Sequence, residues 1–90
     1  MSILHTIPSH SQSVISRMIE DEAVLVLPDA GQVKVLNPVG ARIWSLIDGK
    51  RIVAEIANQV YQEYQVEPTQ AEADTCAFLE DLKSLGILLW

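Results

Sequence analysis

The first half of the chain alternates short apolar runs with turn-forming residues. Residues 14–18 begin with β-branched side chains and residues 23–27 are apolar throughout, so each run predicts a strand. The second run is expected to be covered on both faces or to lie centrally in a small sheet. Residues 28–31 have turn chemistry, which predicts a hairpin into a third strand, Gln32–Leu36.

The third predicted strand, Gln32–Leu36, alternates aliphatic and polar positions. Val33 and Val35 point to one side and Lys34 to the other, which is the pattern of a strand with one buried face and one wet face. A lysine in the middle of such a strand protects a sheet edge from aggregation. We therefore expect this strand at the rim of the sheet, unless the chain termini cover it.

The second half of the chain has helical spacing. Asn37 followed by Pro38 predicts a helix start, because the asparagine can cap the first turn and proline lacks an N–H that would need a partner there. Gly49 predicts the end of this helix. Residues 52–64 carry apolar side chains on one helical face and predict a second helix.

A third helix is predicted to start at Thr69, which has the capping-box spacing with Glu72, and to end at Gly86. The apolar residues 87–90 are expected to pack back onto the core as an extended end. Three strands followed by three helices predict an α+β domain, with the helices on one side of a small antiparallel sheet.

The chain has room for one domain, because 90 residues bury only one core. Residues 1–12 are polar and contain both histidines, so we expect a flexible N-terminal tail, with residues 13–90 as the single domain. No apolar run approaches the ~20 residues that a membrane span needs, and the N-terminus lacks the pattern of a secretory signal. These features predict a cytoplasmic protein without a membrane partner.

The net charge of −6 is unevenly distributed. Residues 52–90 contain seven acidic residues and a single basic residue, Lys83, whereas residues 1–51 are balanced. A nucleic-acid-binding protein needs basic residues to replace the counterions of the phosphates, so the charge argues against a nucleic-acid partner. An acidic surface favours a partner that carries lysine or arginine.

No catalytic constellation is present in the sequence. Cys76 is the only cysteine, which excludes an internal disulfide and a multi-cysteine metal site. A cysteine nucleophile needs a base such as histidine, but His5 and His10 lie in the expected tail, where we predict solvated side chains. The sequence therefore predicts no catalytic residue, no metal ligand and no cofactor.

Three segments carry a family resemblance. They are LNPVGARIWSLIDG at residues 36–49, AEIA at residues 54–57, and the pieces AD, AFLEDL and LG within residues 73–86. In this order, and over roughly residues 14–88, the chain resembles the PqqD family, and especially the stand-alone members encoded with lasso-peptide biosynthesis.

The resemblance implies a recognition element for ribosomally made, post-translationally modified peptides. Such a domain is similar to a winged helix-turn-helix in which the leader of a precursor peptide adds as a strand beside the third strand, against the third helix. It is expected to be non-catalytic and to hold the precursor for partner enzymes. These are a leader peptidase and a macrolactam cyclase in lasso systems, or a radical enzyme in cofactor biosynthesis.

One position departs from the family pattern. The family usually has threonine where this chain has Ile52, and threonine would form a capping box with Glu55. Because an isoleucine side chain cannot accept the amide hydrogen bond, at a cost of ~1 kcal/mol, the start of the second helix is uncertain from sequence.

The candidate peptide site follows from an exposed strand edge and a helix beside it. One flank of the third helix carries Asp74, Ala77 and Asp81, and the other carries Glu72, Cys76 and Lys83. We favour the first flank, because acidic side chains beside a small residue admit a basic and apolar peptide. The alternative, that these aspartates are only solvated, stays open. The predicted peptide-binding residues are Gln32, Val33, Lys34, Val35, Leu36, Asp74, Ala77, Phe78, Asp81 and Leu82, with Phe78 and Leu82 expected to be core residues whose edges form the floor.

A different class of function, a winged-helix DNA-binding regulator, is compatible with the same order of strands and helices. The two hypotheses differ in charge and in salt dependence, since binding to DNA weakens steeply as salt rises. The charge favours the peptide-binding adaptor.

Overall fold

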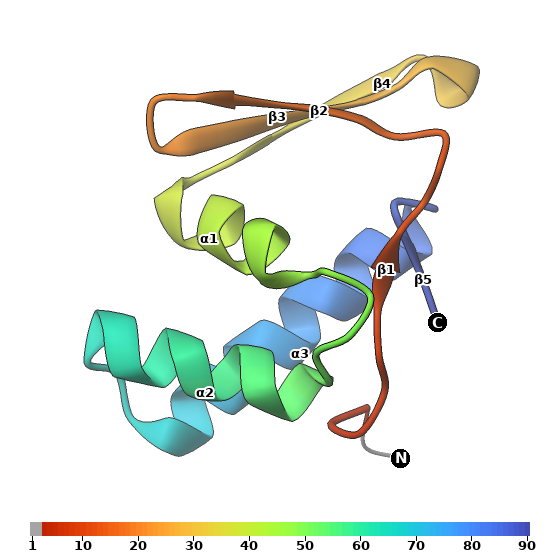
Figure 1. The fold of residues 1–90 in the computed structure, drawn as a ribbon. Coiled ribbons are helices and arrows are strands. Elements are labelled where there is room, and N and C mark those ends of the chain that lie inside the picture. Colours follow the sequence, from red (N-terminus) through yellow and green to blue (C-terminus); the bar gives the residue numbers. More distant parts are fainter. Residues whose placement is uncertain (1–2) are drawn as a thin grey trace.

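The computed structural model describes residues 3–90, in which a three-stranded sheet lies over three helices (Figure 1). This arrangement confirms the predicted α+β class. The sheet strands are β2 (Ile15–Ile19), β3 (Glu22–Leu27) and β4 (Gln32–Leu36), with a 3-10 turn, η1 (Pro28–Ala30), before β4. The helices are α1 (Pro38–Leu46), α2 (Val53–Tyr64) and α3 (Pro68–Ser84), and two short strands, β1 (Ser9–His10) and β5 (Leu88–Leu89), form a separate ladder.

The main sheet has the antiparallel order β2-β3-β4, so β3 is central and β4 is an edge strand, as predicted. Ala23 and Leu25 on β3 are fully buried beneath the sheet, whereas Val24 and Val26, which alternate with them along the strand, are only half-buried. β3 is therefore covered on one face only, not on both.

The expected orientation of β4 is wrong. Val33 and Val35 are 65% and 61% exposed, while Leu36 is buried and Lys34 lies on the inner side. The register explains the reversal, because Leu36 is paired with buried Ala23, and paired residues share a face of the sheet. The predicted alternation along β4 is present, but Val33 and Val35 face away from the helices.

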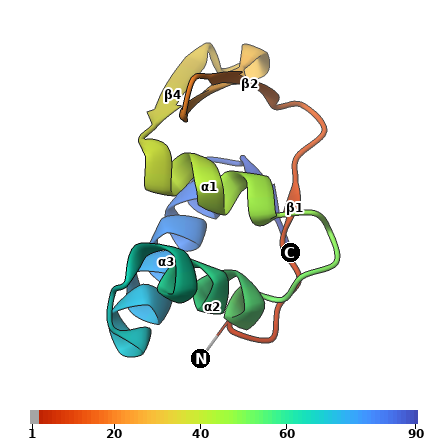
Figure 2. The ribbon, with the colours of Figure 1, turned by 60° about the vertical axis from the view of Figure 1, so that its left-hand side comes forward.

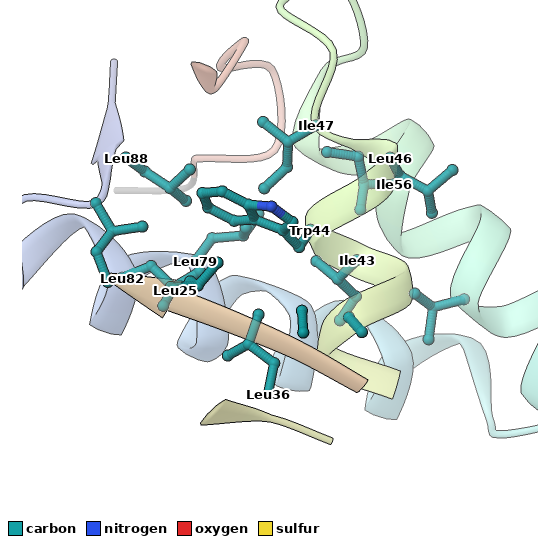
Figure 3. Close-up of a cluster of buried hydrophobic side chains, with 14 of the residues drawn as sticks. Leu25, Leu36, Ile43, Trp44, Leu46, Ile47, Ile56, Leu79, Leu82 and Leu88 are labelled. Carbon is teal, nitrogen blue, oxygen red and sulfur yellow. The ribbon is translucent and has the colours of Figure 1, made fainter. Parts of the chain in front are cut away.

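The core lies between the sheet and the helices, with α1 directly beneath the sheet and α2 and α3 farther from it (Figures 1 and 2). Trp44 on α1 is 4% exposed and packs among aliphatic side chains from every layer (Figure 3). Leu25, Leu79 and Leu82 are fully buried in the same cluster. No helix in residues 3–90 combines the length and the apolar content that a membrane span requires.

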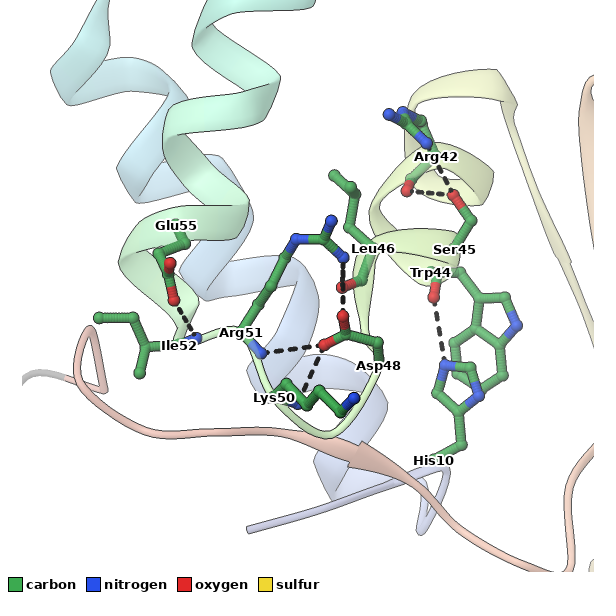
Figure 4. A network of polar contacts seen from close by, with 10 residues as sticks. All are labelled: His10, Arg42, Trp44, Ser45, Leu46, Asp48, Lys50, Arg51, Ile52 and Glu55. Carbon is green, nitrogen blue, oxygen red and sulfur yellow. Dashed lines mark hydrogen bonds and ion pairs between the residues drawn. The ribbon is translucent and has the colours of Figure 1, made fainter.

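The first helix starts where the sequence predicted. The amide N–H of Gly40 donates to Asn37 Oδ1 at 2.8 Å, and Pro38 occupies the first turn. The helix ends at Leu46, before Gly49. Asp48 instead shapes the following loop, where its carboxylate accepts the amide hydrogens of Lys50 and Arg51 at 2.9 Å (Figure 4). These bonds lower the pKa of Asp48.

The starts of the other two helices differ in their caps. At α2 the carboxylate of Glu55 accepts the backbone N–H of Ile52 at 2.9 Å, so half of a capping box is present although Ile52 cannot supply the other half (Figure 4). The capping box predicted at Thr69 is wrong. Glu67 is the N-cap of α3 and Pro68 begins the helix, because proline is well suited to the first helical position.

Residues 3–12 are not a free tail in this structure. Ser9 and His10 pair with Leu89 and Leu88, and the carbonyl of Thr6 accepts the amide hydrogen of Val53 at 2.9 Å. The ring of His10 stacks on Trp44 with centroids 3.7 Å apart, and its Nε2 lies 3.1 Å from the Trp44 carbonyl oxygen (Figure 4). The expected solvated His10 is therefore wrong, whereas His5 is exposed. The rest of the expected tail, residues 1 and 2, lies outside the described residues.

We predict that His10→Ala lowers the free energy of unfolding by ~1–2 kcal/mol, because it removes both a stacked pair and a hydrogen bond to a buried residue. The melting temperature should fall by several degrees in a chain of this size, as measured by circular dichroism. His5→Ala is the matched control and should melt like the wild type. A melting temperature of His10→Ala equal to that of His5→Ala and of the wild type would show that the His10 side chain adds nothing to stability.

A bidentate ion pair joins α1 to α2. Arg42 donates to both carboxylate oxygens of Glu63, with Nη2–Oε2 and Nε–Oε1 distances of 2.8 and 2.9 Å. The hydrogen bonds from Arg42 and then Gln59 lower the pKa of Glu63 to about 2. Both side chains are partly exposed, so solvent screening limits the contribution of the pair to about 1 kcal/mol or less.

Because the pKa of Glu63 is depressed in the folded state, the pair stabilises the protein above the ordinary value of 4.5 and loses this effect as the pH falls toward about 2. Glu63→Gln should therefore lower the melting temperature at pH 7, and the difference from the wild type should shrink as the pH falls from 4.5 toward about 2 and vanish below that value. Thermal melts across this range test the prediction, with exposed Glu80→Gln as the control. A difference for Glu63→Gln that does not change with pH would contradict it.

Candidate functional site

An open hollow of about 280 Å³ lies where β4 runs into α1, beside α3. Its polar side chains include Lys34 from β4 and Asp74 from α3, and half-buried Phe78 contributes an aromatic ring. The remaining lining is largely aliphatic. The residues around the hollow are Lys34, Val35, Leu36, Asn37, Val39, Gly40, Ile43, Asp74 and Phe78.

Gly40 explains how the ring of Phe78 reaches this position. A Cβ atom at residue 40 would lie 3.2 Å from Phe78 Cε1 and 3.3 Å from Asn37 Oδ1, which is tighter than ordinary packing. Glycine is costly inside a helix, by about 1 kcal/mol relative to alanine. The close approach of α3 to the first turn of α1 accounts for its presence there.

A charged contact links β4 to the same flank of α3. Lys34 Nζ lies 3.7 Å from Asp81 Oδ2, with side chains that are 33% and 61% exposed. About two helical turns earlier on α3, Asp74 accepts a hydrogen bond from the side chain of Gln70 at 2.8 Å. The hollow beside β4 therefore has a largely apolar floor, and charged residues of both signs lie at its margins.

The outer edge of β4 has no strand beside it within residues 3–90. The segments near the two chain ends, which could have covered this edge, form β1 and β5 and pair with each other instead. Backbone N–H and C=O groups on such an edge are available to a further strand. Lys34, Val35 and Leu36 of the same strand line the hollow, so the hollow adjoins the strand that has the open edge.

The structure brings together most of the residues selected from sequence. Lys34, Val35, Leu36, Asp74 and Phe78 line the hollow, and Asp81 contacts Lys34. Gln32, Val33 and Ala77 are exposed beside it without lining it. Leu82 is fully buried in the core and lines no part of the hollow, so its predicted place in the floor is wrong.

The contribution of α1 was missed. Asn37, Val39, Gly40 and Ile43 line the hollow, although the sequence was used only to predict that a helix starts there. One sequence feature could have indicated this, since Gly40 stands inside the helix without ending it, as a residue does where another element approaches closely.

The opposite flank of α3 meets other parts of the chain. Glu72 lies with residues of α2 around a separate hollow, and Lys83 Nζ lies 4.5 Å from the ring centroid of Trp90. Cys76 is half-buried, and burial followed by the nearby Glu72 and Glu80 carboxylates raises the pKa of its thiol. Within residues 3–90, no three histidine, cysteine, aspartate or glutamate side chains gather as a metal site would require.

Comparisons with known proteins agree with this geometry. A family model described as coenzyme PQQ synthesis protein D (PqqD) matches residues 22–88. TbiB1 in complex with the TbiA(beta) leader peptide is similar at 35% sequence identity and a TM-score of 0.83, over 89% of this chain and 93% of that chain. No match was found among curated proteins.

Two further solved structures share the fold. A lasso peptide synthetase B1 complexed with the leader peptide has 26% identity and a TM-score of 0.85, over 94% of this chain and 100% of that chain. The PqqD truncation of Methylobacterium extorquens PqqCD, described as a functional and stand-alone RiPP recognition element, has 25% identity and a TM-score of 0.80, over 100% and 96%. With its family match over most of its length and its 35% identity to TbiB1, the chain belongs to the PqqD family.

Proposed function

We propose that this protein is a non-catalytic adaptor that binds the leader of a precursor peptide and presents it to processing enzymes in lasso-peptide biosynthesis. The observation that carries the proposal is the open edge of β4 beside an apolar hollow and the acidic flank of α3. Two similar proteins are described as complexes with leader peptides, which supports the same kind of ligand here.

Strand addition to β4 explains how such a ligand binds. Backbone hydrogen bonds along the edge supply affinity without regard to sequence, and pockets for alternate side chains supply selectivity. Because alternate residues of a strand lie about 7 Å apart on one face, one apolar leader side chain would occupy the hollow, with its neighbours at the charged margins. Asp74 and Asp81 favour a basic leader residue there, and Lys34 offers a partner for an acidic one.

The adaptor role follows because binding holds the precursor next to a partner enzyme. A flexible peptide held next to an enzyme meets the active site as an intramolecular partner, at effective concentrations that reach the millimolar range for short connections. The enzymes that would act on the held precursor are a leader peptidase and a macrolactam cyclase. Cys76 supplies no nucleophile in this proposal, because its raised pKa keeps the thiol protonated at neutral pH.

The alternative of a DNA-binding regulator is disfavoured by the surface of α3. Glu72, Asp74, Glu80 and Asp81 are all exposed on this helix. Acidic side chains on the helix that would approach DNA repel phosphates instead of displacing their counterions.

Amide hydrogen exchange provides a direct test of strand addition. Alternate amides of an edge strand point away from the sheet, so a bound leader should slow exchange at alternate residues of Gln32–Leu36 by at least about tenfold. The TbiA(beta) leader peptide, which is bound in the structure of the similar TbiB1, is a suitable probe. The outward amides of the other edge strand, β2, are the internal control and should not change. Protection on β2 alone, or on neither strand when the leader is bound, would refute docking on β4.

The charged flank of α3 gives a second prediction. The double variant Asp74→Asn and Asp81→Asn should weaken leader binding by ~0.4–2 kcal/mol, since each exposed charge pair contributes ~0.2–1 kcal/mol. The loss should appear mainly in the association rate and should diminish as salt rises. Stopped-flow fluorescence with a labelled leader measures it, and Glu72→Gln with Glu80→Gln is the matched control on the other flank. Equal association rates at low salt for both double variants would remove these aspartates from the site.

A further inference from the structure

A second open hollow lies between α2 and α3, the two helices farther from the sheet (Figures 1 and 2). Its volume is about 380 Å³, within the range of about 300–1,000 Å³ that small-ligand sites occupy. On α3 it lies on the flank opposite to Asp74 and Asp81, since residues eight or nine positions apart from them at 100° per residue face the other way. The residues that line this α2–α3 hollow are Ala54, Ala57, Asn58, Tyr61, Pro68 and Glu72.

The α2–α3 hollow exists because one stripe of α2 carries small side chains. Ala54, Ala57, Asn58 and Tyr61 recur at the spacing of a single helical face. The two alanines leave space beside α3, and Tyr61 borders that space and is 40% exposed. Open space borders Tyr61 on two sides, because it also lines a neighbouring hollow at the end of α2.

The polar side chains of the hollow have no partners within residues 3–90. Asn58, Tyr61 and Glu72 each make no side-chain hydrogen bond or ion pair in this part of the chain. No lysine or arginine occurs on α2, and Lys83, the only one on α3, lies over the ring of Trp90. The charge of Glu72 is therefore not compensated by a cation of the protein.

The electrostatic potential along this flank of α3 is negative. Burial, and then the carboxylates of Glu72 and Glu80, raise the pKa of the Cys76 thiol that lies between them. Residues 52–90 also contain seven acidic residues and one basic residue. A ligand that binds here therefore has to be cationic, which disfavours phosphates and anionic lipids.

We propose that the α2–α3 hollow binds an arginine side chain on the surface of a processing enzyme. A guanidinium group stacks on an aromatic face and donates two parallel hydrogen bonds to a carboxylate, and Tyr61 and Glu72 offer both partners. The aliphatic stem of the arginine would pack against Ala54 and Ala57. Lysine fits less well, because its ammonium group is a strongly hydrated point charge without a planar face.

The choice of an enzyme as the partner rests on the proposed function. An adaptor has to hold the leader and an enzyme at the same time. A leader strand on β4 would contact the flank of α3 that carries Asp74 and Asp81, so an enzyme bound on the opposite flank leaves the leader site free. A second copy is disfavoured, because each copy carries a net charge of −6.

The site is tested by nuclear magnetic resonance titration of the labelled protein with three capped tripeptides that have arginine, lysine or citrulline between two glycines. Citrulline keeps the shape of arginine but is neutral. The arginine peptide should shift the amide signals of the lining residues and saturate in the millimolar range, the lysine peptide should bind at least about twofold more weakly, and the citrulline peptide should not saturate. Equal binding of the arginine and lysine peptides would overturn the inference.

Variants of the lining residues show whether the hollow itself binds the peptide. Glu72→Gln and Tyr61→Leu should each weaken binding of the arginine peptide by about two- to fivefold, since each removes one exposed charge pair or one stacked cation. Glu80→Gln is the matched control, because Glu80 is an exposed acid of the same flank that does not line the hollow. Unchanged affinities for both variants, or signals that shift only around Asp74 and Asp81, would overturn the inference.

Binding of the partners distinguishes the occupants of the hollow. By biolayer interferometry, Glu72→Gln should weaken binding of the leader peptidase or of the macrolactam cyclase by about two- to fivefold, whereas its affinity for the TbiA(beta) leader, measured by fluorescence anisotropy, should equal that of the wild type. Unchanged binding of both enzymes would overturn the inference.

Two other occupants would give different results. A loss of leader affinity in Glu72→Gln would identify the leader as the occupant, and a mass of two chains by light scattering that this variant reduces to one would identify a second copy. Either result would overturn the inference. Failure of the wild type to bind the leader would instead refute the proposed function, while an arginine response confined to the α2–α3 hollow would still support the site.

Discussion

The burial of one face of β3 decides the arrangement of both surfaces of this protein. Ala23, Leu25 and Leu27 must face the helices, and antiparallel pairing forces Leu36 to the same side. Val33 and Val35 then face outward, because a strand cannot change its face without shifting its register. The same constraint directs Lys34, which is paired with buried Leu25, toward α3. The position of Lys34 beside the hollow and the apolar outer face therefore both follow from the burial of one face of β3.

The elements that depend on local chemistry could be predicted, and those that depend on distant partners could not. Asn37 and Pro38 indicate a helix start by themselves, and the turn before β4 indicates a hairpin. The orientation of Val33 and Val35 depends on which residues of β3 are buried, and alternation within β4 carries no information about that choice. Likewise, Thr69 had a plausible capping partner, but Pro68 one residue earlier already met the requirements of the first turn.

The candidate site was predicted in part for the same reason. A period of 100° per residue places Asp74, Ala77 and Asp81 on one flank of α3 and Phe78 in the neighbouring apolar arc, so these residues could be selected from periodicity. The residues that α1 contributes to the hollow depend on how α1 crosses α3, where Gly40 allows the ring of Phe78 to approach. The packing of His10 on Trp44 is equally non-local, since the two residues are far apart in sequence and neither has a motif that indicates the other.

The ion pair between Lys34 and Asp81 is weak enough to be broken when a ligand binds beside β4. Its atoms are 3.7 Å apart and both side chains are partly solvated, so breaking it costs about 1 kcal/mol or less. A buried pair would resist separation by several kcal/mol, because each charge would lose its partner in a low-dielectric surrounding. In the solvent-exposed pair, Lys34 and Asp81 can instead each form a new ion pair with the ligand, since a leader that carries an acidic and a basic residue would neutralise both. Weakness of this contact in the free protein thus lowers the cost of binding at the edge of β4.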